Sequence, residues 1–257
     1  MRRLLLWLAL VALVVALTVL AFLPASWLGQ MVEQQTGGRL TLGDAQGTLW
    51  NGSAFLGGAP GEGGAVTPLL PGRFAWRLSP AVLVGRVSMH VENPQALSQP
   101  LAIEGSWSEW QVSPGELLLP AAGLAGLGAP LNTLAPTGTI KLNWNALEVA
   151  RQGQMVAVTG RTVLSMTDMG SRMSPIKPLG SYEMAMDWHG QQAALVLRTL
   201  RGPLLLSGNG SLQNGRLQFS GQAEAAEGYE DTLGNMLNLL GQRRMVNGKK
   251  VIALEFR

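Results

Sequence analysis

The chain has 257 residues, 47% of them apolar, which is enough for a buried core in one large domain or two small ones. Its 19 basic and 16 acidic residues are scattered, with no basic cluster interleaved with aromatics, which argues against a nucleic-acid partner. The lack of cysteine excludes disulfides, thiol nucleophiles and thiolate metal ligands.

A charge-free apolar run, Leu4 to Leu23, follows residues 1–3. As a helix rising about 1.5 Å per residue it would be about 30 Å long, enough to cross the hydrocarbon core of a bilayer. A signal peptide is the alternative, but the run exceeds the usual apolar region of one and no small-x-small cleavage site aligns with its end. We therefore expect a retained single-pass transmembrane helix over 4–23, with Arg2 and Arg3 in the cytoplasm and the remaining residues on the far side.

Residues 24–38 show a short helical pattern that ends at Gly37 and Gly38. The pattern indicates a juxtamembrane helix or stalk that continues the membrane helix. A stalk that contacts another membrane protein is the alternative. The apolar residues at helical spacing are Trp27, Leu28, Met31 and Val32.

Period-two alternation of apolar and polar residues dominates the rest of the chain. It is clearest at residues 73–78, 83–91, 140–145, 182–188 and 252–256. Turn pairs such as His189-Gly190, Asn214-Gly215 and Asn247-Gly248 separate such runs, and we interpret Asn51-Gly52 and Asn209-Gly210 as turns too. The pattern predicts a mainly β fold: a curved, mostly antiparallel meandering sheet with an apolar inner face. We expect a first β-rich half over 39–119, a linker over 120–137 and a second β-rich half over 138–257.

One amphipathic helix is predicted at about 229–242, before a terminal strand. Leu233, Met236, Leu237 and Leu240 share one face. Such a helix would pack on the apolar face of the sheet or plug one end of it.

Residues that could carry catalysis are sparse. The two histidines, His90 and His189, are predicted on the polar face of a strand and in a turn. Neither belongs to a zinc motif, and no nucleophile elbow, P-loop or dinucleotide fingerprint is present in the sequence. We therefore expect no enzyme activity, no catalytic residues, no metal site and no cofactor.

Large aromatic residues are the remaining candidates for a functional site. Their alternation predicts core positions, while the other interpretation is an apolar groove that holds acyl chains or a partner segment. The candidates for the structural, partner or groove role are Trp50, Trp76, Trp107, Trp144, Trp188 and Phe256.

Four features follow one another along the chain: the N-terminal anchor, TGGRLTLGDAQGTLWNGSA at 36–54, FAWRLSP at 74–80, and LLGQRR at 239–244 before a last strand. Together they resemble the N subunit of type II secretion systems. The resemblance implies a bitopic protein of the bacterial inner membrane with a periplasmic β-rich domain. It would be an accessory scaffold for export of folded proteins across the outer membrane, with other secretion subunits as partners.

That family is similar in turn to AsmA-like proteins, whose curved sheets carry an apolar inner face. This likeness implies the alternative function, a periplasmic module that binds or handles lipid in its groove. A periplasmic hydrolase is a third and weaker hypothesis. On the first hypothesis, Trp50 within GTLWNGSA is scaffold: it lies on an early strand and anchors the sheet beside the membrane.

Overall fold

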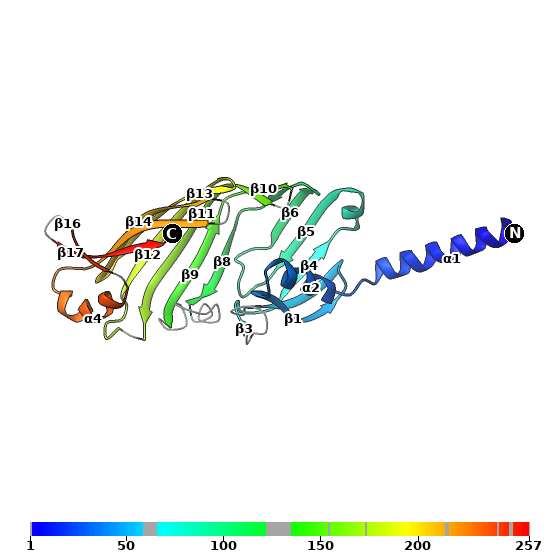
Figure 1. Cartoon of the computed structure of the whole chain (residues 1–257). Helices are drawn as coiled ribbons and strands as arrows, with labels where there is room; N and C mark the ends of the chain where they lie inside the picture. Colours follow the sequence, from blue (N-terminus) through cyan, green and yellow to red (C-terminus); the bar gives the residue numbers. More distant parts are fainter. Residues whose placement is uncertain are drawn as a thin grey trace.

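The structure is a computed structural model that describes residues 2–58, 66–121, 135–153, 155–172, 174–213, 216–240, 242–246 and 249–256. Within these ranges, 17 strands form a single antiparallel sheet (Figure 1), which confirms the predicted mainly β fold. The strands are β1 (Leu40–Gly47), β2 (Asn51–Gly58), β3 (Thr67–Pro68), β4 (Phe74–Leu78), β5 (Arg86–Glu92), β6 (Leu101–Ser106), β7 (Glu109–Val112), β8 (Gly115–Pro120), β9 (Pro136–Trp144), β10 (Leu147–Gln152), β11 (Met155–Ser171), β12 (Gly180–Gly190), β13 (Gln192–Arg201), β14 (Leu204–Gln213), β15 (Arg216–Ala225), β16 (Gln242–Val246) and β17 (Lys249–Phe256).

Helices lie at both ends of the chain, and the predicted C-terminal helix is confirmed. The helices are α1 (Arg2–Ala21), α2 (Ser26–Gln35), the short 3₁₀ helix η1 (Pro80–Val84) and α4 (Glu230–Leu240). In the part of the chain that the structure describes, no helix has the length and apolarity needed to cross a membrane. The predicted membrane span Leu4–Leu23 is therefore not supported. Residues 4–21 of this range lie in α1, which ends at Ala21, and Pro24 forms a β-bridge with Thr48.

The sheet follows a mainly meandering path with two branches, a short one at β2, which pairs with β3 as well as with β1 and β4, and a longer one at β11. Its order runs β1, β2, β4, β5, β6, β7, β10, β11, β12, β13, β14, β15, β17, β16. The first residues of β11 pair with β10, and Thr162 to Ser171 pair instead with β9, which continues to β8. Strands from the two predicted halves thus belong to the same sheet. The predicted linker, 120–137, lies mostly outside the described residues.

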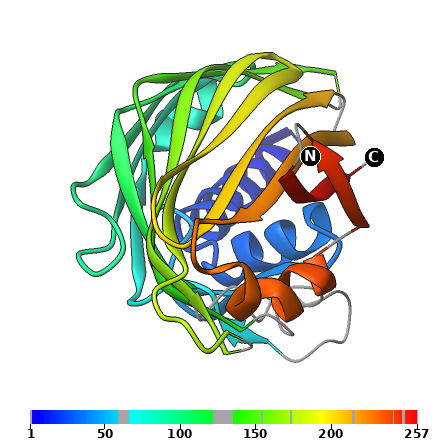
Figure 2. The ribbon, with the colours of Figure 1, turned by 90° about the vertical axis from the view of Figure 1, so that its left-hand side faces the viewer.

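The sheet is strongly curved, and its concave side carries helices at the two ends. Seen along the molecule, the strands follow an arc with α2 and α4 on the concave side (Figure 2). Next to α2, Trp76 is buried with Ala25 and Ala54, while at the other end Leu233 of α4 is buried against Leu204 and Ile252. The core is therefore divided into two clusters, one at each end of the concave face.

Two segments predicted to turn at an Asn-Gly pair do not do so. Asn209 and Gly210 lie inside β14. The hairpin between β1 and β2 turns at Thr48–Asn51, because the Thr48 backbone N–H donates to the Asn51 carbonyl at 3.0 Å and the Asn51 N–H donates to Thr48 Oγ1 at 3.1 Å. A hydroxyl that accepts from a nearby backbone N–H closes a turn as an Asn-Gly pair would. Trp50 therefore lies in this turn and not on a strand.

Candidate functional site

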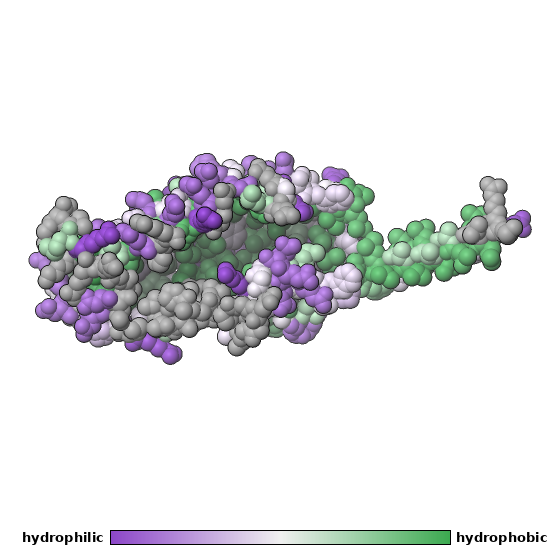
Figure 3. All heavy atoms as spheres, in the orientation of Figure 1, coloured by the Kyte–Doolittle hydropathy of each residue, from purple (hydrophilic) through white to green (hydrophobic). Residues whose placement is uncertain are grey.

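The middle of the concave face carries a row of large apolar side chains. Cross-strand pairing puts them at one level on β8, β9, β11, β12 and β13. We call these residues the inner row: Leu117, Leu142, Leu164, Met184 and Leu197. Each is only partly buried, in contrast to the two clusters at the ends. Figure 3 shows the result, a hollow whose interior is apolar beneath an upper edge that carries many hydrophilic residues.

Aromatic rings lie flat on the concave face because glycines face them on the neighbouring strands. Gly52 pairs with Trp76 and Gly115 pairs with Trp144. A Cβ added at Gly52 would stand 2.5 Å from Trp76 Cζ2, and one at Gly115 would stand 2.6 Å from Trp144 Cζ2. The ring thus occupies the space of the missing side chain, as in aromatic rescue of strand glycines. This arrangement fills the sheet surface without filling the hollow.

Gly115→Ala is expected to lower the free energy of unfolding by about 1–3 kcal/mol, the usual cost of overpacking. The added methyl would lie 2.6 Å from both Leu101 Cδ2 and Trp144 Cζ2, and the indole is held in place by its hydrogen bond to the Ser113 carbonyl. Chemical denaturation of the purified chain measures the change. Gly234→Ala is the matched control, since nothing lies within 4 Å of its added methyl in α4 and helix propensity favours alanine by about 1 kcal/mol. Equal destabilisation of both variants would contradict the packing explanation.

The indole N–H groups of the candidate tryptophans are used within the fold. Trp144 Nε1 donates to the Ser113 carbonyl at 2.9 Å, and Trp188 Nε1 donates to Thr162 Oγ1 at 3.0 Å. Buried indoles usually find such partners. Because these donors are already satisfied, the two rings present only apolar surface to the hollow.

The opposite, convex face carries charged side chains. Its side chains form ion pairs between adjacent strands, such as Arg198 with Glu183 at 2.7 Å and Lys141 with Glu116 at 2.9 Å. These pairs are largely exposed and each contributes little to stability. The two faces of the sheet therefore differ in chemistry as the alternation predicts, with the polar face solvated and the apolar face turned to the hollow.

Tyr182 shows how dry the floor of the sheet is near α4. Its side chain is buried, and its hydroxyl donates to the Leu204 carbonyl at 3.1 Å. Burial raises the pKa of the Tyr182 phenol well above its ordinary value of 10.0, because the phenolate would lose its hydration.

The raised pKa of Tyr182 predicts a loss of stability at alkaline pH. Above pH 10 the unfolded chain releases this proton while the folded chain keeps it. The free energy of unfolding should therefore be unaffected by this group below pH 10 and fall by up to about 1.4 kcal/mol per pH unit above it. Denaturation at pH 8–11 measures the slope. Tyr182→Phe should reduce the slope, whereas Tyr229→Phe, at an exposed site, should leave it. Equal slopes in both variants would refute this origin.

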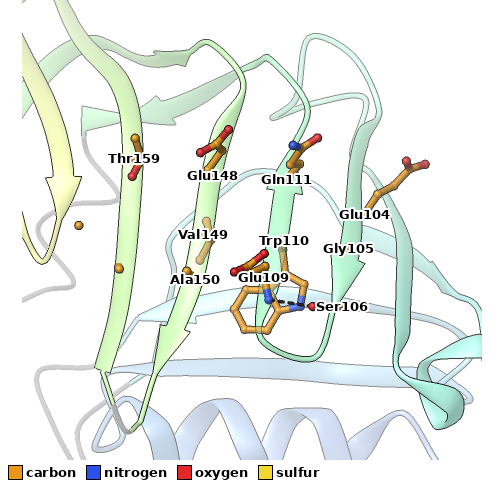
Figure 4. A pocket seen from close by; sticks show the side chains of 12 residues that line it. Glu104, Gly105, Ser106, Glu109, Trp110, Gln111, Glu148, Val149, Ala150 and Thr159 are labelled. Carbon is orange, nitrogen blue, oxygen red and sulfur yellow. Dashed lines mark hydrogen bonds between the residues drawn. The ribbon is translucent and has the colours of Figure 1, made fainter.

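A pocket of about 740 Å³ lies where β6, β7, β10 and β11 meet (Figure 4). Cross-strand pairing aligns Glu104, Gln111, Glu148 and Thr159 along it. Figure 4 also shows Glu109 beside Ser106, whose hydroxyl accepts the Glu109 backbone N–H at 3.2 Å. The lining residues include carboxylates and a serine but no histidine or lysine to activate that serine. The arrangement has no nucleophile–base pair.

The two histidines lie on different strands, β5 and β12. His90 is exposed on β5, paired with Arg77 and Ala102. His189, predicted in a turn, lies instead in β12, where it pairs with Thr159 and Gln192. Among the described residues, no group of three or more histidines, aspartates and glutamates is placed to hold a metal ion.

The predicted site residues separate into four places. Trp144 and Trp188 lie on the concave face, and Trp76 lies in the end cluster beside α2. Trp107 was expected on a strand but is 59% exposed in the turn between β6 and β7, and Trp50 is likewise in a turn. Phe256 pairs with Phe219 through the backbone of β17.

Trp110 is a concave-face aromatic that was not singled out from the sequence. It pairs with Gly105 on one side and Val149 on the other. Its signal was present, since Trp110 and Val112 alternate with Glu109 and Gln111. The alternation spans only four residues, which is too short to separate a strand from a turn by pattern alone.

Comparison with known proteins gives one match. The family of type II secretion system protein N matches residues 38–252. No curated protein and no solved structure matches the chain. The matched region begins just before β1 and ends inside β17. It therefore contains the inner row and the strand residues of both end clusters. The chain therefore belongs to the type II secretion system protein N family.

Proposed function

We propose that the chain is an accessory subunit of a type II secretion system whose sheet serves as a periplasmic scaffold for other subunits. The observation that carries the proposal is that the family match and the sheet coincide: one continuous antiparallel sheet occupies the matched region. A sheet of this extent is a rigid support, and its polar convex face and strand edges offer docking surface.

The proposed location is the inner membrane, with the β domain in the periplasm and α1 as the attachment. Most side chains of α1 are apolar and more than half exposed, including Leu8, Val11 and Leu17. A contiguous apolar surface of this kind is unusual on a protein that contacts only water. Partition of its apolar side chains into a bilayer would remove that cost.

In-cell photocrosslinking tests the scaffold proposal. Photoreactive residues placed at Asn143 and Arg198 report partners of the convex face, since both side chains point away from the inner row. Adducts to secretion subunits, with reduced release of exported proteins when the gene is deleted, would support the proposal. Normal export without the gene would refute it.

Lipid handling is a second candidate, because a specific feature favours it. The inner row remains partly exposed between the two buried clusters, which leaves an apolar hollow (Figure 3). An acyl chain is an occupant of matching chemistry. Probes at Leu142 and Leu197 should then give phospholipid adducts, while probes at their sequence neighbours Asn143 and Arg198 should not. Equal lipid labelling on both faces would count against the groove.

A further inference from the structure

Three exposed apolar side chains form a projecting group at one end of the sheet. We call Leu83, Val84 and Trp107 the apolar tip. Their exposed fractions are 48%, 77% and 59%. Leu83 and Val84 belong to η1 and Trp107 to the β6–β7 turn, and the Trp107 indole N–H donates to the Val82 carbonyl. Two connections distant in sequence thus hold one apolar surface together.

The tip is held in place by local structure. Ser79 caps η1 by accepting the Ala81 backbone N–H, and Gly85 ends it with φ of 90°, a left-handed conformation that suits glycine. In the next turn, Ser106 accepts the Glu109 N–H and so fixes the position of Trp107. The capped helix η1 and the serine-based turn therefore fix the backbone in a conformation that leaves these large side chains only partly covered.

The tip lies at the end of the sheet from which α1 leaves. The link is a short series of hydrogen bonds: the Trp50 indole donates to the Leu20 carbonyl of α1 at 2.8 Å, and the Leu78 N–H donates to the Trp50 carbonyl at 2.8 Å. Leu78 directly precedes Ser79, the cap of η1. Figure 1 places η1 and the start of β5 at the same end of the sheet as α1, and Figure 3 shows apolar surface on this end of the domain next to α1.

We infer that the apolar tip inserts into the headgroup region of the membrane to which α1 attaches. Three observations select a lipid surface as the occupant. The tip lies at the α1 end, its indole has its polar atom satisfied while the ring is exposed, and the exposed cation Arg86 directly follows Gly85 at the end of η1. Tryptophan favours the membrane interface, and basic side chains favour anionic headgroups. The inference rests on the proposed membrane attachment through α1.

Contact at the tip would give the domain a second point of attachment. With α1 alone, the angle between the sheet and the bilayer would depend only on the contacts that residues 20–25 make with the β1–β2 turn. With η1 also at the interface, the sheet is held in one orientation and the hollow keeps a fixed angle to the bilayer. Partners that dock on the convex face would then meet it at a constant orientation to the bilayer.

The test uses the natural lack of cysteine, which makes single-cysteine labelling specific. The full-length chain carrying Val84→Cys is labelled with an environment-sensitive fluorophore and mixed with phosphatidylcholine–phosphatidylglycerol vesicles that contain doxyl-labelled lipid. Val196→Cys is the control for exposure, since this 46% exposed residue lies on the convex face of β13. Val14→Cys in α1 reports the attachment itself.

An insertion depth of about 5–10 Å should quench the label at position 84 by about twofold and leave the label at position 196 unchanged. Quenching at 14 without quenching at 84 would overturn the tip while the attachment stands. No quenching at 14 would refute the attachment. In a chain labelled through Leu83→Cys, adding Val84→Asp should abolish the quenching at 83; retained quenching would show that the fluorophore alone drives insertion and overturn the inference.

Discussion

Trp76→Ala is expected to lower the free energy of unfolding by about 3–5 kcal/mol, the largest effect of any single substitution considered. Trp76 is 4% exposed and belongs to the cluster that joins α2 to the sheet. Its removal leaves a cavity above Gly52, which has no side chain to fill it, and leaves the Leu49 carbonyl without the indole N–H that it accepts at 3.0 Å. Denaturant unfolding of the purified full-length chain measures the loss.

Trp107→Ala is the matched control for this result. The same side chain is removed, and its indole also donates to a backbone carbonyl, but the ring is mostly exposed. Its loss should cost about 1 kcal/mol or less in detergent solution, as for surface substitutions in general. An equal loss in the two variants would contradict the claim that burial of Trp76 in the end cluster beside α2 stabilises the fold.

Trp76 and Trp107 show where period-two alternation predicts a strand position correctly and where it fails. Both were predicted on apolar strand faces, and the pattern is correct for Trp76 because FAWRL forms one uninterrupted strand. For Trp107 the pattern is wrong, because Ser106 accepts the backbone N–H groups of Ser108 and Glu109 and turns the chain between β6 and β7. A serine-based turn is a weaker sequence signal than an Asn-Gly pair.

The candidate groove was only partly predictable. Period-two alternation identifies which residues share a face, so the apolar side of β9 and β12 can be predicted from the sequence. The pairing of Gly115 with Trp144 depends on register between strands, which alternation does not fix. The partial exposure of the inner row depends on the curvature of the sheet and on where α2 and α4 pack. Those are tertiary properties.

Leu142→Glu is expected to reduce acyl-chain binding about tenfold or more if the hollow holds lipid. A carboxylate at the centre of the inner row would have to be desolvated against the bound chain, which costs several kcal/mol for an unpaired charge. Leu142 pairs with Leu117 and Leu164, so the substitution alters the middle of the hollow and neither end cluster. The measurement is displacement of a fluorescent fatty acid from the purified chain, together with the phospholipid that copurifies.

Asn143→Glu is the matched control, because the next residue on β9 faces the convex side and receives the same charge. It should leave lipid binding unchanged. Leu142→Gln separates charge from folding: it removes the apolar contact without an ion, so it should weaken binding less than Leu142→Glu at an unaltered melting temperature. Equal lipid binding by all three variants would show that the hollow does not hold lipid. If export of secreted proteins also falls only with Asn143→Glu, then the convex face carries the function.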